Sequence, residues 1–167
     1  MPWSKVPPML LDCPPGDLCQ RAYQGHRRGC PNYRKRPTCP PRAERWTPDS
    51  IALYEWYAVW VAFEFGAHVE RMRVAHPDWS QRQLECCLYW QGTARKRLRR
   101  AVDEFLRLEL AVSPHPDQVK EITAYYIPEA HGCDVTATMA TLGVSLEWPP
   151  QTTTHHVAMV RVLKGGE

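Results

Sequence analysis

The first 48 residues are crowded with prolines and cysteines, and this feature limits most strongly what the chain can fold into. Nine of the 16 prolines lie before position 42, and four of the seven cysteines lie before position 40. Proline fixes φ and lacks an amide hydrogen, so we expect no regular secondary structure over this quarter of the chain. The stretch also lacks apolar periodicity and cannot bury enough surface to offset the entropy of ordering. A bound metal would order it, and without such an interaction it would stay disordered.

Length and composition limit the class of protein. The chain has 167 residues, of which 44% are hydrophobic and 23% charged, and this suits one folded domain. No apolar run approaches the ~18 residues of a membrane span, and the N-terminus MPWSKVPPML lacks the apolar core of a secretory signal. We therefore expect no membrane association and a cytoplasmic location, where clustered cysteines hold metals more often than they form disulfides.

From residue 49 onward the pattern of apolar residues predicts strands and helices. β-Branched and aromatic residues predict strands over 57–65 and 156–163, and a short strand over 144–147. The continuous apolar character of 57–65 favours a strand that is covered on both faces. Apolar spacing, N-cap residues and terminating prolines or glycines predict helices over 66–75, 81–90, 93–110, 117–126 and 135–142.

These elements predict an α/β fold class: a small mixed sheet with several helices and a loop-rich N-terminal cysteine arm folded around a metal site. We expect a single domain over residues 1–167. Within it, residues 1–48 form the cysteine-rich metal-binding arm and residues 49–167 form the α/β core. The chain contains no internal repeat, so a repeat architecture is not indicated.

The cysteines of the arm have the spacing of metal ligands carried on loops. Cys30 follows Cys19 by 11 positions and Cys39 follows Cys30 by 9, and a proline comes directly after both Cys30 and Cys39. Proline stiffens a loop and lowers its unfolded-state entropy, which suits a pre-shaped ligand turn. Gly25 and Gly29 permit the tight backbone that brings loop sulfurs together.

The type of metal follows from the spacing of the thiols. A closed site needs about four ligands, and zinc sites nearly always use closely spaced CxxC pairs, which this chain lacks. Single, widely spaced thiolates suit the larger iron–sulfur cluster better. We therefore expect one cysteine-ligated iron–sulfur cluster, of the [4Fe-4S] type, with zinc as the alternative metal.

Two stretches of the sequence resemble a known family. GCPNY, followed after five residues by CPP and far downstream by PEAHGCDVTATMATLG, is similar to the predicted metal-binding proteins grouped as domain of unknown function 2284. Residues 128–135 match most of that family's segment Met-Glu-Ala-x-Gly-x-Asp-Val, and the likeness spans residues 19–146 in order. The family usually carries further cysteines between the two stretches, where this chain has only Cys86 and Cys87, and this argues for one site. The resemblance implies cysteine-bound metal, expected to be iron–sulfur, and implies no reaction.

We assign the fourth ligand to Cys87, with Cys86 and Cys13 as alternatives. Cys13 precedes the motif in a proline-rich end, and Cys133 stands where the related segment has an apolar residue, so Cys133 is expected in the core. On a helix, Cys86 and Cys87 would point about 100° apart, so both could not face one cluster. Cys87 comes at the end of the predicted helix, where a ligand can meet a loop. The predicted cofactor ligands are Cys19, Cys30, Cys39 and Cys87.

The arm is also strongly basic. Residues 21–45 carry eight arginines and lysines against one acid, Glu44, and tyrosines lie among them. Such a stretch could follow a nucleic-acid backbone, or its arginines could offset the negative charge of a thiolate-bound cluster. The formal net charge of +3 is below what a dedicated nucleic-acid-binding protein usually shows.

Other candidate residues have ordinary structural interpretations. His155 and His156 would point to opposite faces of a strand, so they cannot share one site. His26 lies between two expected ligands and could donate a hydrogen bond to a cluster sulfur. Trp56 and Trp60 are expected in the core. The chain contains no Ser-His-Asp order, P-loop or GxGxxG motif, so the catalytic residues are unknown and enzymatic activity is undecided.

These observations lead to three functional hypotheses. The first is a cytoplasmic iron–sulfur protein in an electron-transfer or accessory role within a complex, with a protein partner. The second is a zinc-stabilised nucleic-acid-binding module that uses the basic arm. The third is a cluster-dependent enzyme. Iron with acid-labile sulfide would support the first or third hypothesis, and zinc without sulfide the second.

Overall fold

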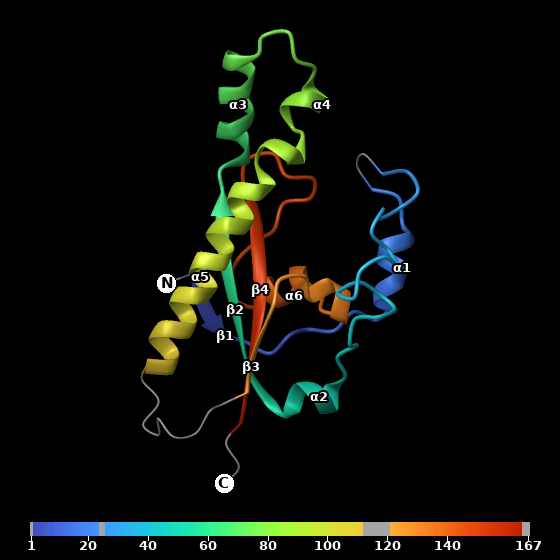
Figure 1. Ribbon diagram of the computed structural model, residues 1–167, viewed down its shortest axis with the longest axis vertical. Helices are drawn as coiled ribbons and strands as arrows, with labels where there is room; N and C mark the ends of the chain where they lie inside the picture. Colours follow the sequence, from blue (N-terminus) through green and yellow to red (C-terminus); the bar gives the residue numbers. More distant parts are fainter. Residues whose placement is uncertain (1, 24–25, 112–120, 165–167) are drawn as a thin grey trace.

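A four-stranded antiparallel sheet lies at the centre of the residues that the computed structural model describes, 2–23, 26–111 and 121–164 (Figure 1). The two long strands, β2 (Tyr54–Phe63) and β4 (Thr154–Leu163), are each 10 residues long and pair along their whole length. β1 (Trp3–Lys5) pairs with β2, and β3 (Ile122–Tyr125) pairs with β4. The order is therefore β1-β2-β4-β3, and the predicted α/β fold class is confirmed.

Both faces of the long strand pair are covered, as the apolar run predicted. Successive residues of a strand point to opposite faces, and Trp56 and Ala58 enter one apolar cluster while Val59 enters another. The first cluster includes residues of α6 (Val135–Ala140), and the second includes residues of the long helix α5 (Gln91–Ala111). The α5 residues in the second cluster are Leu98, Ala101, Val102 and Phe105.

A helical extension projects beyond one end of the sheet (Figure 1). It consists of α3 (Phe65–Ala75), α4 (Gln81–Leu84) and the 3-10 turn η1 (Cys87–Tyr89). Proline at position 77 disfavours helix in the preceding residue, and α3 ends just before it. A third apolar cluster holds this extension to the first turns of α5; its buried members are Phe63, Phe65, Val69, Leu84, Trp90 and Ala94.

Three short helical segments, α1, α2 and η2, lie where the arm meets the core. α1 (Pro15–Gln20) lies in the arm and packs near the 3-10 turn η2 (Pro128–His131). α2 (Pro48–Ala52) follows the arm and begins with a capping box between Thr47 and Ser50, which satisfies backbone groups at the helix start. No helix within the described ranges is both long enough and apolar enough to cross a membrane.

The expectation that the first quarter lacks regular secondary structure is wrong, because it contains both β1 and α1. Pro15 occupies the first turn of α1, where its missing amide hydrogen has no helical partner to lose. β1 pairs with β2 at the sheet edge, and the carbonyl of Pro2 just before it accepts a hydrogen bond from the amide of Trp60. Proline therefore shapes the ends of these elements.

Three other local predictions differ from the structure. The helix predicted over 117–126 lies partly outside the described residues, and its last part is strand β3, which fills the free edge of β4. Residues 144–147 form no strand; the amide of Val144 donates to the carbonyl of Met139 at the end of α6, and Val144 and Leu146 pack on the first apolar cluster. The helix predicted over 81–90 ends at Leu84, so Cys86 and Cys87 lie beyond it.

Candidate metal centre

The cysteine loop, residues 13–45, leaves the core and returns to it at one place. Just before the loop, the amide of Leu11 donates to the carbonyl of Gly132 at 2.8 Å, and the amide of Asp134 donates to the carbonyl of Met9 at 2.8 Å. Just after the loop, the amide of Trp46 donates to the carbonyl of His131 at 2.9 Å. Both ends of the loop are therefore fixed to residues 131–134, from the last residue of η2 to the residue before α6.

Trp46 is the main apolar anchor at the end of the loop. It is 1% exposed, its ring centroid lies 4.5 Å from that of Trp56, and it stacks on His131 at 5.1 Å. Burial lowers the pKa of His131, and its Nδ1 lies 2.6 Å from the carbonyl oxygen of Glu44. Because a carbonyl can only accept, Nδ1 carries the hydrogen and donates it.

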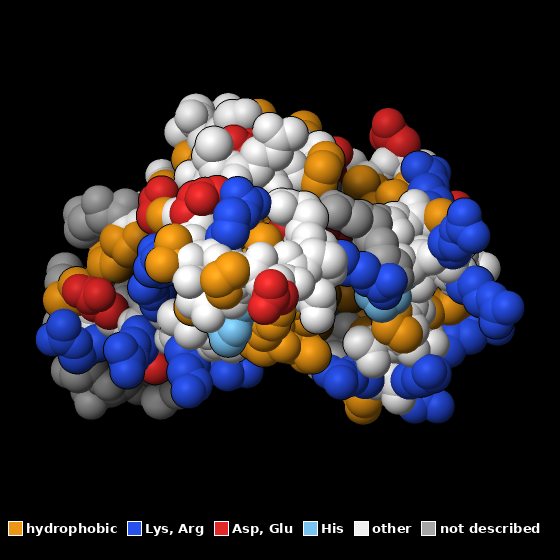
Figure 2. Space-filling model, turned by 90° about the horizontal axis from the view of Figure 1, so that it is seen from above, with side chains coloured by type: hydrophobic (Ala, Val, Ile, Leu, Met, Phe, Trp, Pro, Cys, Tyr) orange, Lys and Arg blue, Asp and Glu red, His pale blue; other side chains and the backbone are white. Residues whose placement is uncertain are grey.

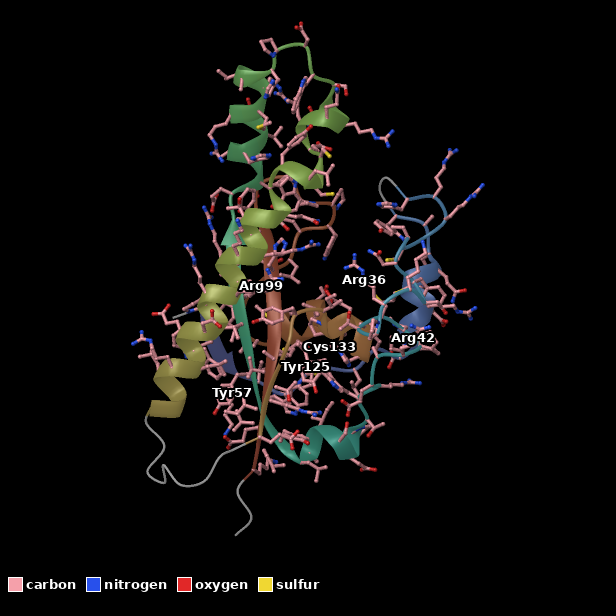
Figure 3. All side chains as sticks on the ribbon, viewed as in Figure 1. Arg36, Arg42, Tyr57, Arg99, Tyr125 and Cys133 are labelled. Carbon is pink, nitrogen blue, oxygen red and sulfur yellow. The ribbon has the colours of Figure 1, made fainter. Side chains whose placement is uncertain are left out.

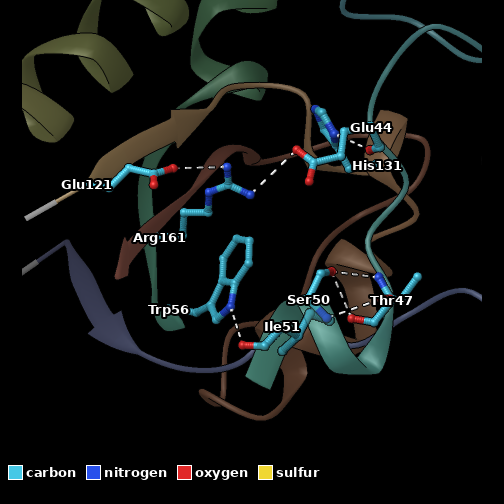
Figure 4. A network of polar contacts seen from close by, with 8 residues as sticks. All are labelled: Glu44, Thr47, Ser50, Ile51, Trp56, Glu121, His131 and Arg161. Carbon is cyan, nitrogen blue, oxygen red and sulfur yellow. Dashed lines mark hydrogen bonds and ion pairs between the residues drawn. The ribbon is translucent and has the colours of Figure 1, made fainter. Parts of the chain in front are cut away.

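Arg161 of β4 connects the same anchor to the sheet (Figure 4). Its guanidinium lies 3.5 Å from the carboxylate of Glu44 and 3.5 Å from that of Glu121. The guanidinium also lies 4.4 Å from the centre of the Tyr54 ring. Glu44, the one acid among the basic residues 21–45, thus pairs with Arg161 of the sheet and not with an arginine of the arm.

The backbones of Cys19 and Cys30 are joined directly. The amide of Cys30 donates to the carbonyl of Cys19 at 2.7 Å, and Gly29 just before it has a φ of +77°. A Cβ at Gly29 would overlap the carbonyl oxygen of Cys19, and L side chains rarely adopt this φ. Glycine at position 29 therefore lets the backbones of Cys19 and Cys30 approach each other.

A second turn presents Cys39. The amides of Arg42 and Ala43 donate to the carbonyl of Cys39 at 3.0 and 3.1 Å, which makes a tight turn over this residue. The amide of Arg34, in the left-handed region with a φ of 62°, donates to the carbonyl of Pro40 at 3.1 Å. These bonds hold the segment before Cys39 against the segment after it.

The thiols of the loop influence one another electrostatically. Burial raises the pKa of the Cys19 thiol, and negative charge on Cys30, Cys39 and Glu129 raises it further. Such an effect requires the groups to lie near each other. Cys19, Cys30 and Cys39 are therefore in one neighbourhood.

Tyr23 extends this neighbourhood toward η1. Burial raises the pKa of its hydroxyl, and the sulfurs of Cys30, Cys19 and Cys87 raise it further. The smallest contribution to this raised pKa is hydrogen bonding with the Cys30 sulfur. Cys87, on η1 and exposed, thus lies on the side of the core that faces the loop.

The remaining cysteines and His26 have other surroundings. Cys133 is fully buried in the first apolar cluster, its sulfur is 3.6 Å from the hydroxyl of Thr138, and burial raises its pKa to about 12. Its predicted core position is confirmed. Cys13 and Cys86 are partly exposed, and all seven cysteines are free thiols. The His26 ring lies 4.8 Å from the Tyr23 ring, so it packs beside the residue that contacts Cys30.

The four predicted ligands do not form a closed site for a single ion. Within the described ranges, no group of three or more histidine, cysteine, aspartate or glutamate side chains could hold one metal ion. His155 and His156 are on β4, where adjacent side chains point to opposite faces, and His156 lies edge-on to Trp90. The loop cysteines thus lie in the same region, but their side chains are not arranged around one ion within the described ranges.

A pocket of about 210 Å³ lies beside the loop. Glu129 and His155 line it together with apolar side chains, among them Leu18 of α1. Burial raises the pKa of Glu129, although solvent reaches this residue.

The sequence patterns did not identify Glu129 or Tyr23 as neighbours of the cysteines. Glu129 could have been predicted as a neighbour of the cysteines, because it lies in residues 128–135, the stretch that resembles the metal-binding family.

Comparisons with protein-family models, curated proteins and solved structures find no match to this chain.

Proposed function

We propose that this protein binds one iron–sulfur cluster, of the [4Fe-4S] type, through Cys19, Cys30, Cys39 and Cys87. The observation that carries the proposal is the pair of tight turns that present the loop cysteines: the amide of Cys30 donates to the carbonyl of Cys19 at 2.7 Å across Gly29, and the amides of Arg42 and Ala43 donate to the carbonyl of Cys39. The raised pKa values of Cys19 and Tyr23, to which Cys30, Cys39 and Cys87 contribute, agree with this arrangement. These residues come from two turns of the loop and from η1, which are far apart in the sequence.

The donor set suits such a cluster. Negative charge on neighbouring groups disfavours ionisation of the Cys19 thiol, and the positive charge of bound iron would reverse that effect because metal ligation deprotonates thiols. Gly29 leaves room beside Cys19 that a side chain would fill. Iron–sulfur clusters supply one-electron transfer at a potential set by hydrogen bonds, charge and exposure.

Residues around the ligands would control that environment. Tyr23 is positioned to donate a hydrogen bond to the Cys30 sulfur, and the exposed arginines of the arm would offset the net negative charge of a thiolate-bound cluster. The site is close to the surface, and Cys87 itself is exposed. An exposed site suits electron exchange with a protein partner in a larger complex, within a reducing cytoplasm.

The direct test is metal analysis of protein purified without oxygen. We expect a brown protein that holds iron and acid-labile sulfide and that bleaches in air. A colourless protein with stoichiometric zinc would overturn the cluster and support the zinc alternative.

Single serine variants test the ligand assignment. Cys19→Ser, Cys30→Ser, Cys39→Ser and Cys87→Ser should each lower the iron content and alter the visible spectrum. Cys86→Ser is the matched control, because it removes the adjacent thiol, and it should retain full iron. If Cys86→Ser loses iron while Cys87→Ser keeps it, the assignment of the fourth ligand is wrong.

A further inference from the structure

The basic residues of this protein are concentrated on two segments that face solvent. Eight of the 21 lysines and arginines lie between residues 21 and 45, and all eight are exposed. Five more follow one another closely on α5 and are also exposed; they are Arg95, Lys96, Arg97, Arg99 and Arg100. We call these thirteen residues the basic face.

No residue of the basic face makes an ion pair within the described parts of the chain, although Asp103 and Glu104 follow Arg99 and Arg100 by one helical turn on α5. In the described parts of the chain the ion pairs involve Lys5, Arg73 and Arg161, none of which belongs to the basic face. Glu44, the one acid between residues 21 and 45, pairs with Arg161 of the sheet. The charges of the basic face are therefore free to meet an external anion.

The arm and α5 lie on opposite sides of the molecule in the view of Figure 1. Figure 2 shows lysine and arginine side chains gathered toward both sides of the molecule, with a depression between them. In Figure 3, Arg36 lies on the side of the arm that faces the core, and Arg99 lies on α5 across from it. On α5, residues four apart lie about 6 Å apart along the same face, so Arg95 and Arg99 form a row.

The chemistry of the face favours phosphate over carboxylate partners. Eleven of its thirteen residues are arginine, whose planar guanidinium binds phosphate oxygens in pairs. Two half-exposed tyrosines accompany it: Tyr23 is 50% exposed in the arm and Tyr89 is 51% exposed on η1, next to Cys87. Exposed aromatic rings among cations are typical of surfaces on which unpaired bases stack.

We propose that the basic face binds single-stranded nucleic acid, with the arginines on the phosphates and the two tyrosines against bases. The α5 half of the face does not depend on the cluster, since the apolar side of α5 packs on the sheet, whereas the arm half belongs to the loop that the proposed cluster would order. DNA and RNA strands share the required chemistry. A structured duplex would hide its bases from the tyrosines.

The test uses the full-length protein and labelled oligothymidine and oligouridine strands of about 16 nucleotides, with fluorescence anisotropy at several salt concentrations. Binding should weaken linearly on a logarithmic salt scale, with a slope of about −0.7 for each phosphate neutralised. The ratio of affinities for the two strands distinguishes RNA from DNA. Iron is measured on every sample, so loss of the cluster is seen separately from loss of binding.

Two triple alanine variants divide the face. One changes Arg34, Lys35 and Arg36 in the arm, and the other changes Arg95, Lys96 and Arg99 on α5; each should reduce the salt slope by about 2. The control removes three cations elsewhere by changing Lys5, Arg71 and Lys164 to alanine, and it should keep both affinity and slope. Tyr89→Ala should weaken binding roughly five-fold or more with an unchanged slope, whereas Tyr89→Phe should bind normally.

Four results would overturn the proposal. The first is no binding of either strand at low salt, and the second is a control variant as impaired as the two face variants. The third is equal affinity for a duplex of the same length, which would remove the role of unpaired bases. The fourth is competition by polyglutamate as effective as that by the unlabelled strand, which would point to an acidic protein partner.

Discussion

The cysteine loop and the central sheet are stabilised in different ways. β2 and β4 share ten register pairs and contribute fully buried residues to apolar clusters on both faces, such as Val59, Ala58 and Met159. The cysteine loop has short backbone hydrogen bonds at its turns, and its charged residues are exposed. Its apolar anchor, Trp46, lies one residue outside the loop.

The difference shows what each region requires. The sheet buries enough apolar surface to offset the entropy of its own ordering. The loop is closed at its ends by hydrogen bonds to residues 131–134, but its interior has four thiols and many arginines where a core would be. The loop therefore depends on its fixed ends and, under our proposal, on bound metal.

The largest effect should come from removing the metal. Under our proposal, metal binding and loop ordering are one event. Chelation of the anaerobically prepared protein should therefore reduce amide protection in residues 16–43 to the level of an unfolded chain, while β2 and β4 keep theirs. Hydrogen exchange measured by mass spectrometry on both forms checks this. Equal protection of the loop with and without metal would show that it orders itself.

A substitution at Trp46 tests whether this residue anchors the end of the cysteine loop in the core. Trp46→Ala should lower the free energy of unfolding by about 3–5 kcal/mol, because it removes a fully buried indole from between Trp56 and His131. Trp148→Ala is the matched control, since Trp148 is 76% exposed, and it should change stability by less than about 0.5 kcal/mol. Denaturant unfolding gives both values. Similar losses for the two variants would mean that Trp46 is not an anchor.

Gly29 tests the loop without touching the sheet. Gly29→Ala should destabilise the loop by about 1–2 kcal/mol, because alanine is disfavoured at a φ of +77° and its Cβ would meet the carbonyl of Cys19. The expected result is weaker iron retention with unchanged unfolding of the sheet. Gly92→Ala, where no atom lies within 4 Å of the new Cβ, should leave both properties intact. Normal iron retention in Gly29→Ala would remove the argument for a close approach.

The smallest effect concerns the loop before β4, where the carboxylate of Glu147 accepts hydrogen bonds from residues 151–153. The hydroxyl of Thr152 and the amides of Gln151, Thr152 and Thr153 donate to the carboxylate of Glu147, and these bonds lower its pKa from the ordinary value of 4.5 to about 2. Since the folded pKa is depressed, the carboxylate contributes stability above pH 4.5, and this contribution is lost as the pH falls toward about 2.

Glu147→Gln should therefore increase amide exchange at residues 151–153 at neutral pH but not near pH 2. Because Glu147 is exposed, the change should be small and local. Amide hydrogen exchange of the wild type and the variant, measured at neutral pH and near pH 2, tests whether the difference between them disappears as the pH falls. A difference that grows as the pH falls would contradict it.

Local patterns determined the central elements of this protein. The β-branched and aromatic run before Phe63 predicted β2 and its burial on both faces, and apolar spacing predicted the long helix α5. The break at His76-Pro77 predicted the end of α3. These predictions succeeded because proline geometry and side-chain periodicity act within a few residues of sequence.

Local patterns failed where partners distant in sequence decide the outcome. The segment Ile122–Tyr125 is a strand because the edge of β4 offers hydrogen bonds to it. Residues 144–147 are not a strand; the amide of Val144 donates to the carbonyl of Met139 at the end of α6, and Val144 and Leu146 pack on the first apolar cluster. β1 forms in a proline-rich stretch because β2 presents an edge to it. Edge availability belongs to the assembled sheet and is not written in a short window of sequence.

The sequence by itself identified the thiols, the glycine and the basic residues, because the chemistry of a side chain is the same wherever it lies. Only the tertiary structure decided which of them meet. It fixed both ends of the cysteine loop to residues 131–134, and it brought Cys87 within electrostatic range of Tyr23 and Glu129 within electrostatic range of Cys19. These neighbours are separated by many residues along the chain, so their approach depends on how the arm packs against the core.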